Sequence, residues 1–318
     1  MSDECAISVN MLLSYIATVL GAATTISATP VSAYANGTIG PENGHLVIVG
    51  GNLQSDSIWK KIIELAGGPN APIVVIPTAG GDPSYNDGFA SAVTLRELGA
   101  NNVTVLHTYD PAVADTDEFV APLLDAGGIF FGGGRQWRLV DAYAGTKAET
   151  AFRSVLDRGG VISGSSAGAS IQGSFLARGD TANNQVMIGD HTVGFGYLKN
   201  AAIDQHVLVR NRHFDLFDIL KVHPELLGVG IDEDTALIVH KNEAQVFGRT
   251  YALIYDSGFY SEEGIDLKNL PPPAERFYFL KPDEKYDLKA RKVIGTNATA
   301  GTAADHAELE NVGWRYKR

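Results

Sequence analysis

Short apolar runs alternate along the chain with segments in which apolar residues recur at helical spacing. Residues 46–49 are apolar without a break, whereas in 56–66 the apolar residues Ile58, Ile62 and Leu65 recur every three or four positions. An unbroken apolar run is typical of a strand buried on both faces, and the alternation predicts parallel β-α units with helices over both faces of a sheet. We expect strands at 45–49, 73–77, 103–106 and 128–131, and helices at 56–66, 89–98, 136–143 and 148–156.

The second half of the chain is richer in short apolar runs joined by turns. These runs lie at 229–231, 236–239, 244–247 and 251–254. They predict antiparallel strands that extend the sheet, with a last edge strand at 277–280 after the linker Pro271-Pro272-Pro273. The predicted fold class is therefore α/β, a three-layer sandwich with a mostly parallel central sheet and antiparallel strands added in the C-terminal half.

The N-terminal segment has the pattern of a secretory signal peptide. Residues 11–28 are apolar or small apart from Ser, Thr and Tyr, and sites of the A-x-A type end at Ala33 and at Ala35. The residues before this segment include Asp3 and Glu4 but no Lys or Arg, so the usual positive region is missing. A signal anchor and a buried N-terminal helix stay open as alternatives. The predicted organisation is a signal peptide over 1–35, one α/β domain over 36–294 and a polar tail over 295–318.

Composition and charge restrict the partners and the compartment. The formal net charge of −12 and the lack of a basic stripe argue against nucleic acid as a partner. The one cysteine, Cys5, lies in the predicted signal peptide, so a mature chain would have no disulfide and no thiolate metal site. Sequons at Asn36, Asn102 and Asn297 favour a secreted, extracellular glycoprotein. No stable membrane association is expected after signal removal, and a homodimer is compatible with the sequence.

The segment 159–169 is the most informative part of the chain. It has the layout of a strand, a tight turn and a helix, and Gly164-x-Ser166-x-Gly168 matches a nucleophile elbow. Glycines suit such a turn because they let the helix approach closely, and the amide of Ala167 would then point into an oxyanion hole. The alternative for this pentapeptide alone is a small-residue loop at a strand end, which is common in α/β proteins.

A nucleophilic serine needs a base, and the base needs an acid to orient it. His206 follows a short apolar stretch and Glu233 ends another strand, so both are expected at the rim where Ser166 and Gly132-Gly133-Gly134 lie. Each has a structural alternative: a surface or core histidine, a solvated acidic turn at 232–234, and a flexible glycine turn. Arg210 and Arg212 share one face at strand spacing, where they could bind a carboxylate, although surface charges would look the same.

Four motifs occur together in the chain. They are Phe130-Phe131-Gly132-Gly133-Gly134-Arg135-Gln136, Gly164-Ser165-Ser166-Ala167-Gly168-Ala169, Asp204-Gln205-His206 with Arg210 and Arg212, and Gly230-Ile231-Asp232-Glu233-Asp234-Thr235-Ala236. In type, order and spacing this set resembles the cyanophycinase-like serine peptidases of family S51, which also contains aspartyl dipeptidases. The resemblance covers roughly residues 45–293 and implies a class I glutamine amidotransferase-like α/β sandwich.

The resemblance also implies a role for each matching residue. Ser166 would be the nucleophile, His206 the general base and Glu233 the third member of the triad. Backbone amides at Gly133 or Gly134 and at Ala167 would form the oxyanion hole. No metal or organic cofactor is implied. The pocket accepts an acidic residue in the family, often one linked through its β-carboxyl, and here it would be lined by Gln136, Asp204, Gln205, Arg210 and Arg212.

Two positions depart from the pattern of the cyanophycin-cleaving members. Those members have a third arginine where this chain has Asp215, and Arg135 stands where an acidic residue is frequent. Asp215 changes the local charge by two units, which weakens the prediction of cyanophycin itself as the substrate and could favour a basic group on it. Both departures leave the predicted triad unchanged.

The sequence therefore predicts a secreted serine peptidase that cleaves a peptide or isopeptide bond beside an aspartyl residue. Its expected partner is a peptide substrate with an acidic or β-aspartyl residue. The alternatives are an α-aspartyl dipeptidase and, from another class, a non-catalytic binding protein on the same scaffold. A glutamine amidotransferase is disfavoured because that class uses a cysteine at the elbow, where this chain has Ser166.

Overall fold

The computed structural model of the protein describes residues 37–256 and 277–295. The described residues from Thr38 onward form a single unit, which contains all of the described helices and strands. Several predicted features lie outside the described residues: the signal peptide with its sites at Ala33 and Ala35, the sequons at Asn36 and Asn297, the linker 271–273 and the tail from residue 296.

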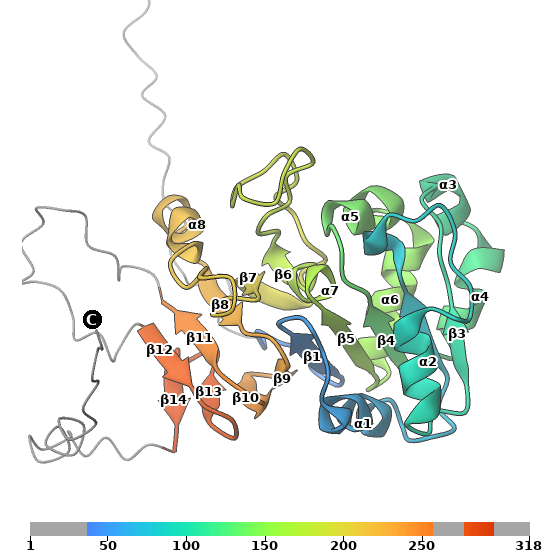
Figure 1. Cartoon of the computed structure of the whole chain (residues 1–318), viewed down its shortest axis with the longest axis horizontal. Coiled ribbons are helices and arrows are strands. Elements are labelled where there is room, and N and C mark those ends of the chain that lie inside the picture. The colour runs from blue at the N-terminus through green and yellow to red at the C-terminus, as the bar shows by residue number, and fades with distance from the viewer. Residues whose placement is uncertain (1–36, 257–276, 296–318) are drawn as a thin grey trace, which may run out of the picture. The chain divides into compact units, whose positions relative to one another are not determined.

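A large mixed sheet forms the centre of the molecule (Figure 1). Its strands run parallel from β1 to β3 and antiparallel from β1 to the opposite edge, so the predicted three-layer α/β sandwich with added antiparallel strands is confirmed. The strand order is β14 (Lys292–Ile294), β13 (Lys285–Asp287), β10 (Glu243–Gly248), β9 (Thr235–His240), β1 (His45–Val49), β5 (Val161–Ser165), β4 (Gly128–Phe131), β2 (Ile73–Ile76) and β3 (Val103–Val105).

A second, five-stranded sheet was not expected from the sequence. Its order is β12 (Phe277–Leu280), β11 (Ala252–Tyr255), β8 (Leu227–Ile231), β7 (Leu198–Gln205) and β6 (Gly173–Phe175). The expectation that all four apolar runs of the second half extend one sheet is therefore wrong for β8 and β11. Strand β8 is buried along its whole length. Burial on both faces marks a strand as internal but does not tell which sheet it joins.

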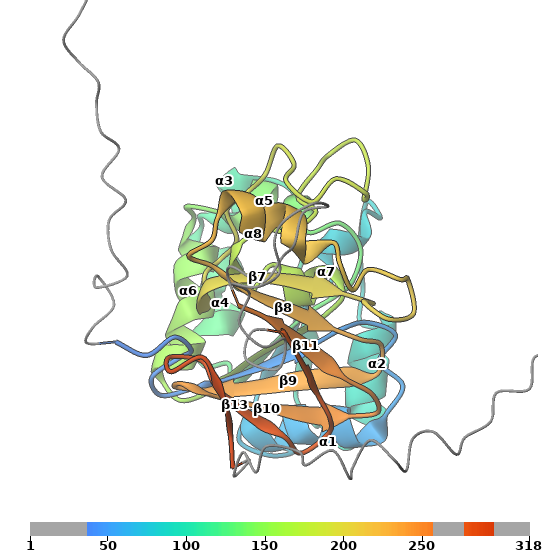
Figure 2. The ribbon, with the colours of Figure 1, turned by 90° about the vertical axis from the view of Figure 1, so that its left-hand side faces the viewer.

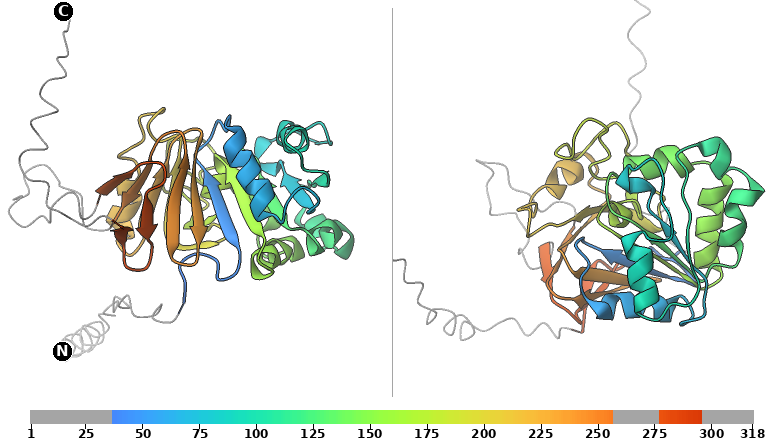
Figure 3. Two further views of the ribbon diagram at one scale, coloured as in Figure 1. Left: turned by 90° about the horizontal axis from the view of Figure 1, so that it is seen from below. Right: turned by 45° about the vertical axis from the view of Figure 1, so that its right-hand side comes forward.

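Helices cover both faces of the parallel part of the large sheet (Figure 3). Val47 and Val49 pack against Ile58 and Ile62 on one face. Alternate residues of the same strand, such as Ile48, join the core that contains Phe152 on the other face. The first face carries α1 (Asp56–Leu65) and α2 (Ala90–Glu97), and the second carries α4 (Asp117–Leu124), α5 (Trp137–Tyr143) and α6 (Lys147–Asp157), with the short α3 (Pro111–Ala114) beside them.

The second sheet is packed between the large sheet and one helix, α8 (Leu216–Val222). Val229 and Ile254 share a core with Leu237 and Val246 of the large sheet. On the other face, Leu253 packs in the cluster of Ile219. Figure 2 shows these layers from top to bottom as α8, then β7, β8 and β11, then β9 and β10, with α1 below.

The carboxyl ends of strands from both sheets meet at one rim. Val49 pairs with Ser165, and Gln205 pairs with Ile231. Three consecutive carbonyls after β1 join these ends: Val49 O accepts the Ser166 amide at 3.1 Å, Gly50 O accepts the His206 amide at 2.8 Å, and Gly51 O accepts the Asp234 amide at 2.9 Å. The loops that carry the predicted nucleophile, base and acid are thus bound to one short segment.

The aromatic core under α6 offers a test of this packing. Phe152 is fully buried, and its ring lies 5.2 Å from Phe131 and 5.4 Å from Tyr143 between centroids. We expect Phe152→Ala to lower the free energy of unfolding by about 3–5 kcal/mol, because a large cavity would be left in a rigid core. The matched control is Phe214→Ala, since Phe214 is 62% exposed, and it should cost less than about 1 kcal/mol. Denaturant unfolding measures both, and equal losses would contradict this account of the core.

Candidate active site

Ser166 lies on the predicted elbow between β5 and a single helical turn, α7 (Ala167–Ser170). Its backbone has φ +58° and ψ −113°, a conformation that non-glycine residues rarely adopt and that is typical of strained functional turns. A Cβ at Gly164 would overlap the Gly168 carbonyl, and one at Gly168 would overlap the Phe131 carbonyl. The two glycines are therefore required for α7 to pack this close to β4 and β5.

His206 directly follows β7 and reaches Ser166 from the second sheet. Its Nε2 lies 3.0 Å from Ser166 Oγ, and the residue is only 5% exposed. Gly51 lies against the imidazole, and a Cβ at Gly51 would overlap the ring. The absence of a side chain at position 51 thus leaves the space in which the ring sits.

Glu233 follows β8 and binds the opposite side of the imidazole. Its Oε1 lies 2.6 Å from His206 Nδ1, and its Oε2 accepts a hydrogen bond of 2.9 Å from Asn52 Nδ2. An ionised carboxylate only accepts, so Nδ1 of a neutral imidazole must carry the proton. Nε2 then presents a lone pair to Ser166 Oγ, which is the arrangement that a general base requires.

Burial and neighbouring charges set the protonation of this pair. Burial is the largest influence on His206 and lowers its pKa below 6.5, with Arg210 and Arg212 acting in the same direction and Glu233 opposing them. Burial raises the pKa of Glu233, but the hydrogen bonds from His206 and Asn52 outweigh it, so the net pKa is lowered. Near neutral pH the site therefore holds a neutral imidazole beside an ionised carboxylate.

The two aspartates that flank Glu233 are buried rather than solvated. Asp232 accepts the amides of Leu208 and Val209, both at 3.1 Å. Asp234 accepts the amides of Gln54 and Ser55, at 2.9 and 2.7 Å. They are 3% and 5% exposed, so the alternative of a solvated acidic turn is wrong for these two residues. Their hydrogen bonds fix the His206 loop and the start of α1.

The predicted oxyanion-hole residues surround Ser166 unequally. A Cβ on Gly133 would lie 3.4 Å from Ser166 Cβ, whereas one on Gly134 would overlap the Ala79 carbonyl. Gly133 is thus the glycine that faces the serine. In the described part of the chain, the amides of Gly133 and Ala167 donate to no backbone carbonyl, which leaves both free to bind an oxyanion.

The two arginines predicted to share a face have separate environments. The chain turns after Gln205 instead of continuing as a strand, and Asn211 has φ +56°, so strand spacing does not apply and that expectation is wrong. Arg210 is exposed and lowers the pKa of both His206 and Glu233, which places its charge within electrostatic reach of them. Arg212 is 6% exposed and donates to the carbonyl and to Oε1 of Gln205, at 3.2 and 3.1 Å.

Arg178 is a residue of this region that sequence reasoning missed. It is fully buried and binds Asp204 through two hydrogen bonds of 2.8 and 3.0 Å. Its Nη2 also donates to Asp215.

Gln136 holds the loop that carries Arg178, since its Nε2 donates to the carbonyls of Ala177 and Arg178 at 2.6 and 3.1 Å. Arg135 donates to the Asn183 carbonyl of that loop. The burial of Arg178 could not be predicted, because the residue lies in a polar stretch after β6, a short strand that the sequence did not indicate.

The contacts of Asp215 change the expectation about charge. Its carboxylate is bound by Arg178, and that guanidinium also neutralises Asp204. The acid at position 215 is therefore engaged within the protein and does not present an unpaired negative charge to a substrate. Relative to an arginine, Asp215 still changes the local charge by two units, and Arg178, which comes from a distant part of the chain, compensates part of that change.

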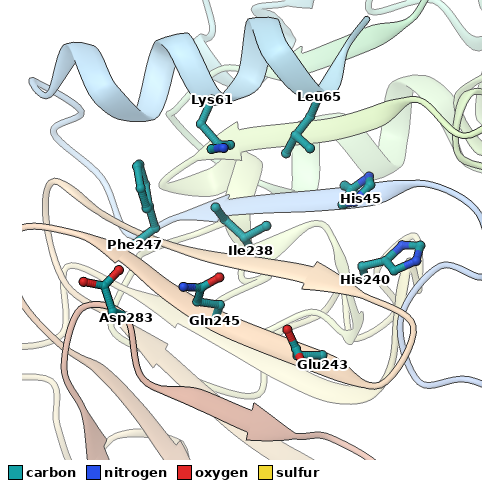
Figure 4. Close-up of a pocket in the computed structure, with 9 residues that line it drawn as sticks. All are labelled: His45, Lys61, Leu65, Ile238, His240, Glu243, Gln245, Phe247 and Asp283. Atoms are coloured by element: carbon teal, nitrogen blue, oxygen red, sulfur yellow. The ribbon is translucent and has the colours of Figure 1, made fainter.

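A separate pocket of about 400 Å³ lies on the α1 face of the large sheet (Figure 4). His45 opens β1 and stacks on His240, with ring centroids 4.6 Å apart. Because β1 runs parallel to β5, His45 lies at the opposite end of the strands from Ser166. None of the predicted site residues lines this pocket. The lining residues are His45, Lys61, Leu65, Ile238, His240, Glu243, Gln245, Phe247 and Asp283.

Neither a membrane span nor a metal cluster occurs in the described ranges, 37–256 and 277–295. They contain no helix with the length and apolar character needed to cross a bilayer. They also contain no cluster of three or more His, Cys, Asp or Glu side chains arranged to hold a metal ion.

Known proteins are similar to this chain in sequence and in fold. Residues 46–247 match peptidase family S51. A cyanophycinase of Geminocystis herdmanii (strain PCC 6308) is 29% identical over 265 residues, which cover 78% of this chain and 94% of that protein. A cyanophycinase of Synechococcus elongatus is 30% identical over 272 residues, which cover 79% and 81%. The crystal structure of a peptidase from an acI-B1 actinobacterium superimposes with a TM-score of 0.58 at 26% identity, over 78% of this chain and 98% of that one. The resemblance inferred from the motifs is confirmed.

The close contact between Gly51 and His206 can be tested directly. We expect Gly51→Ala to slow covalent labelling of Ser166 by a fluorophosphonate about 100-fold, because the added methyl displaces the imidazole from Ser166. Gly99→Ala is the matched control. Gly99 also has a positive φ, +106° against +129° for Gly51, but a Cβ there would meet nothing within 4 Å. The control also places a side chain at a positive φ but without the clash, so equal labelling of the two variants would refute the positioning role of position 51.

Proposed function

We propose that this chain, which belongs to peptidase family S51 and is a serine-type peptidase, hydrolyses peptide or isopeptide bonds beside aspartyl residues. The reaction would pass through an acyl-enzyme on Ser166. The observation that carries the proposal is the continuous hydrogen-bonded chain from Ser166 Oγ through His206 to Glu233.

The reaction follows from the directions of these hydrogen bonds. Ser166 Oγ attacks the substrate carbonyl carbon while its proton passes to His206 Nε2. The amides of Gly133 and Ala167 bind the oxyanion as negative charge develops. His206 then protonates the leaving nitrogen, the C–N bond breaks and the acyl-enzyme remains. Water, deprotonated by the same imidazole, releases the acid and restores Ser166.

The charges near the triad support an acidic substrate group. Arg178 and Arg212 together offset Asp204 and Asp215, and Arg212 is turned inward onto Gln205. Arg210 is the exposed cation of this group and acts electrostatically on His206 and Glu233. A guanidinium binds both oxygens of a carboxylate, so Arg210 is the residue best suited to receive the aspartyl carboxyl group.

Two other functions remain as alternatives to be separated by experiment. An α-aspartyl dipeptidase would use the same triad on ordinary α-linked dipeptides. A non-catalytic binding protein would have no need for the aligned hydrogen bonds at Ser166 and His206, and this argues against it. The similarity to proteins named cyanophycinases favours the β-linked substrate.

We also propose that the protein is secreted and active outside the cell. The apolar segment 11–28 and the small residues that follow it support export. Among the sequons, Asn102 lies in the described part of the chain and is exposed just before β3, so it is accessible to a glycan.

Hydrolysis assays on β-Asp-Arg oligomers and α-Asp-X dipeptides test the proposed activity. We expect the full chain to release arginine-containing product from the β-linked oligomers and Ser166→Ala to release none, because the alanine has no nucleophile. Full activity of Ser166→Ala would refute the mechanism. Hydrolysis of the α-linked dipeptides alone would establish the dipeptidase, and an unmodified chain that neither hydrolyses peptides nor takes up a serine-directed probe would be a binding protein.

The lowered pKa of His206 predicts the pH dependence of the reaction. Only the neutral imidazole can accept the proton of Ser166, so kcat/KM should be full near neutral pH and fall to half at a pH below 6.5. Glu233→Gln should reduce the plateau and move this midpoint to lower pH, because a neutral amide no longer stabilises the imidazolium. A midpoint above 6.5 in the unaltered protein would contradict the dominant effect of burial.

A further inference from the structure

The segment after β1 contains a side chain that touches the triad from outside. Asn52 lies next to Gly51, and its Nδ2 donates to Glu233 Oε2 at 2.9 Å. The amide orientation is fixed by chemistry, because the carboxylate can only accept a hydrogen bond. On its other side, Asn52 Oδ1 accepts a hydrogen bond of 3.1 Å from Gln54 Nε2.

The two carboxylate oxygens of Glu233 therefore have different hydrogen-bond partners. One oxygen is bound by His206 Nδ1 at 2.6 Å and the other by Asn52. The Glu233 side chain is 18% exposed, so a carboxylate held by only one oxygen could rotate toward water and release the imidazole.

We propose that Asn52 is a positioning residue of the active site, which acts through Glu233 by binding the carboxylate oxygen that His206 does not use. The inference rests on the proposed function of the triad. Asn52 itself touches neither Ser166 nor the place where the scissile bond must lie.

A purely structural role for Asn52 must be separated from this one. Asn52 has φ +41°, and asparagine is among the residues that tolerate positive φ. Two substitutions keep that backbone acceptable: Asn52→Gly removes the amide, and Asn52→Asp replaces the donor with a second carboxylate of the same shape.

The test is the rate at which a fluorophosphonate labels Ser166 in the full chain, measured across pH. We expect both variants to lower the plateau rate about tenfold, the effect of losing one hydrogen bond to a charged group. Asn52→Asp should also raise the pH of half-maximal labelling by about half a unit, because a nearby negative charge stabilises the imidazolium of His206. A structural role alone would lower the melting temperature and leave the plateau rate of folded Asn52→Gly unaltered, so the plateau of this uncharged variant separates the two roles.

Asn43→Asp is the matched control. Asn43 lies just before β1, at the end away from the site, and makes a similar exposed hydrogen bond, from Nδ2 to the Asp157 carbonyl at 3.1 Å. The same charge change there should leave the rate and the midpoint unaltered. If the unmodified chain is labelled and Asn52→Gly matches it in plateau rate, the positioning role is refuted and the proposed function stands. If the unmodified chain takes up no probe, both proposals fail.

Discussion

The active site depends on three consecutive backbone carbonyls after β1. Ser166 comes from the large sheet, whereas His206 and Glu233 come from the second sheet, and no strand pairing connects β5 with β7 or β8. Val49, Gly50 and Gly51 bind the amides of Ser166, His206 and Asp234 in that order. Because neighbouring carbonyls of one segment have a nearly fixed spacing, the three loops are held in register with one another. The relative position of the proposed nucleophile, base and acid is therefore set mainly by the β1 loop and less by the sheet that carries Ser166.

The same hydrogen bonds stabilise a strained backbone. Ser166, His206 and Asp234 have φ of +58°, +56° and +52°, conformations that cost of order 1–3 kcal/mol each for residues with a side chain. Each of these residues donates its amide to one of the three carbonyls, so the strain and the bond that offsets it occur at the same position. The side chains of Asp232 and Asp234 add to this by binding the amides of the His206 loop and of the start of α1. Strain concentrated in this way is typical of sites whose geometry must be fixed before substrate arrives.

The sequence predicted the parallel half of the fold well because its signals are local. Strands β1 and β4 have the predicted bounds, and α1 and α6 differ from theirs by about one residue at an end. The turn at Ser166 could also be predicted from the sequence, because a nucleophile elbow is encoded by adjacent residues. The second sheet was missed because β7 mixes Lys199, Asn200 and Asp204 with apolar residues, and its partners are set by tertiary packing. Arg178 and Asn52 could not be found for the same reason, since each acts on a residue far away in the sequence, Asp204 in one case and Glu233 in the other.

The distribution of charge explains how a buried histidine can serve as a base among so many ionised groups. Glu233 alone would raise the pKa of His206, whereas burial, Arg210 and Arg212 lower it and together prevail. The two acids next to these arginines, Asp204 and Asp215, are both bound by Arg178, and Arg212 lies 3.9 Å from Asp204, so two cations balance the two acids. Without the positive charge of Arg178, the two carboxylates would carry excess negative charge, which favours the imidazolium of His206 over its neutral form. The ion pairs of Arg178 thus let the positive charge of Arg210 act on His206 with less opposition from these two acids.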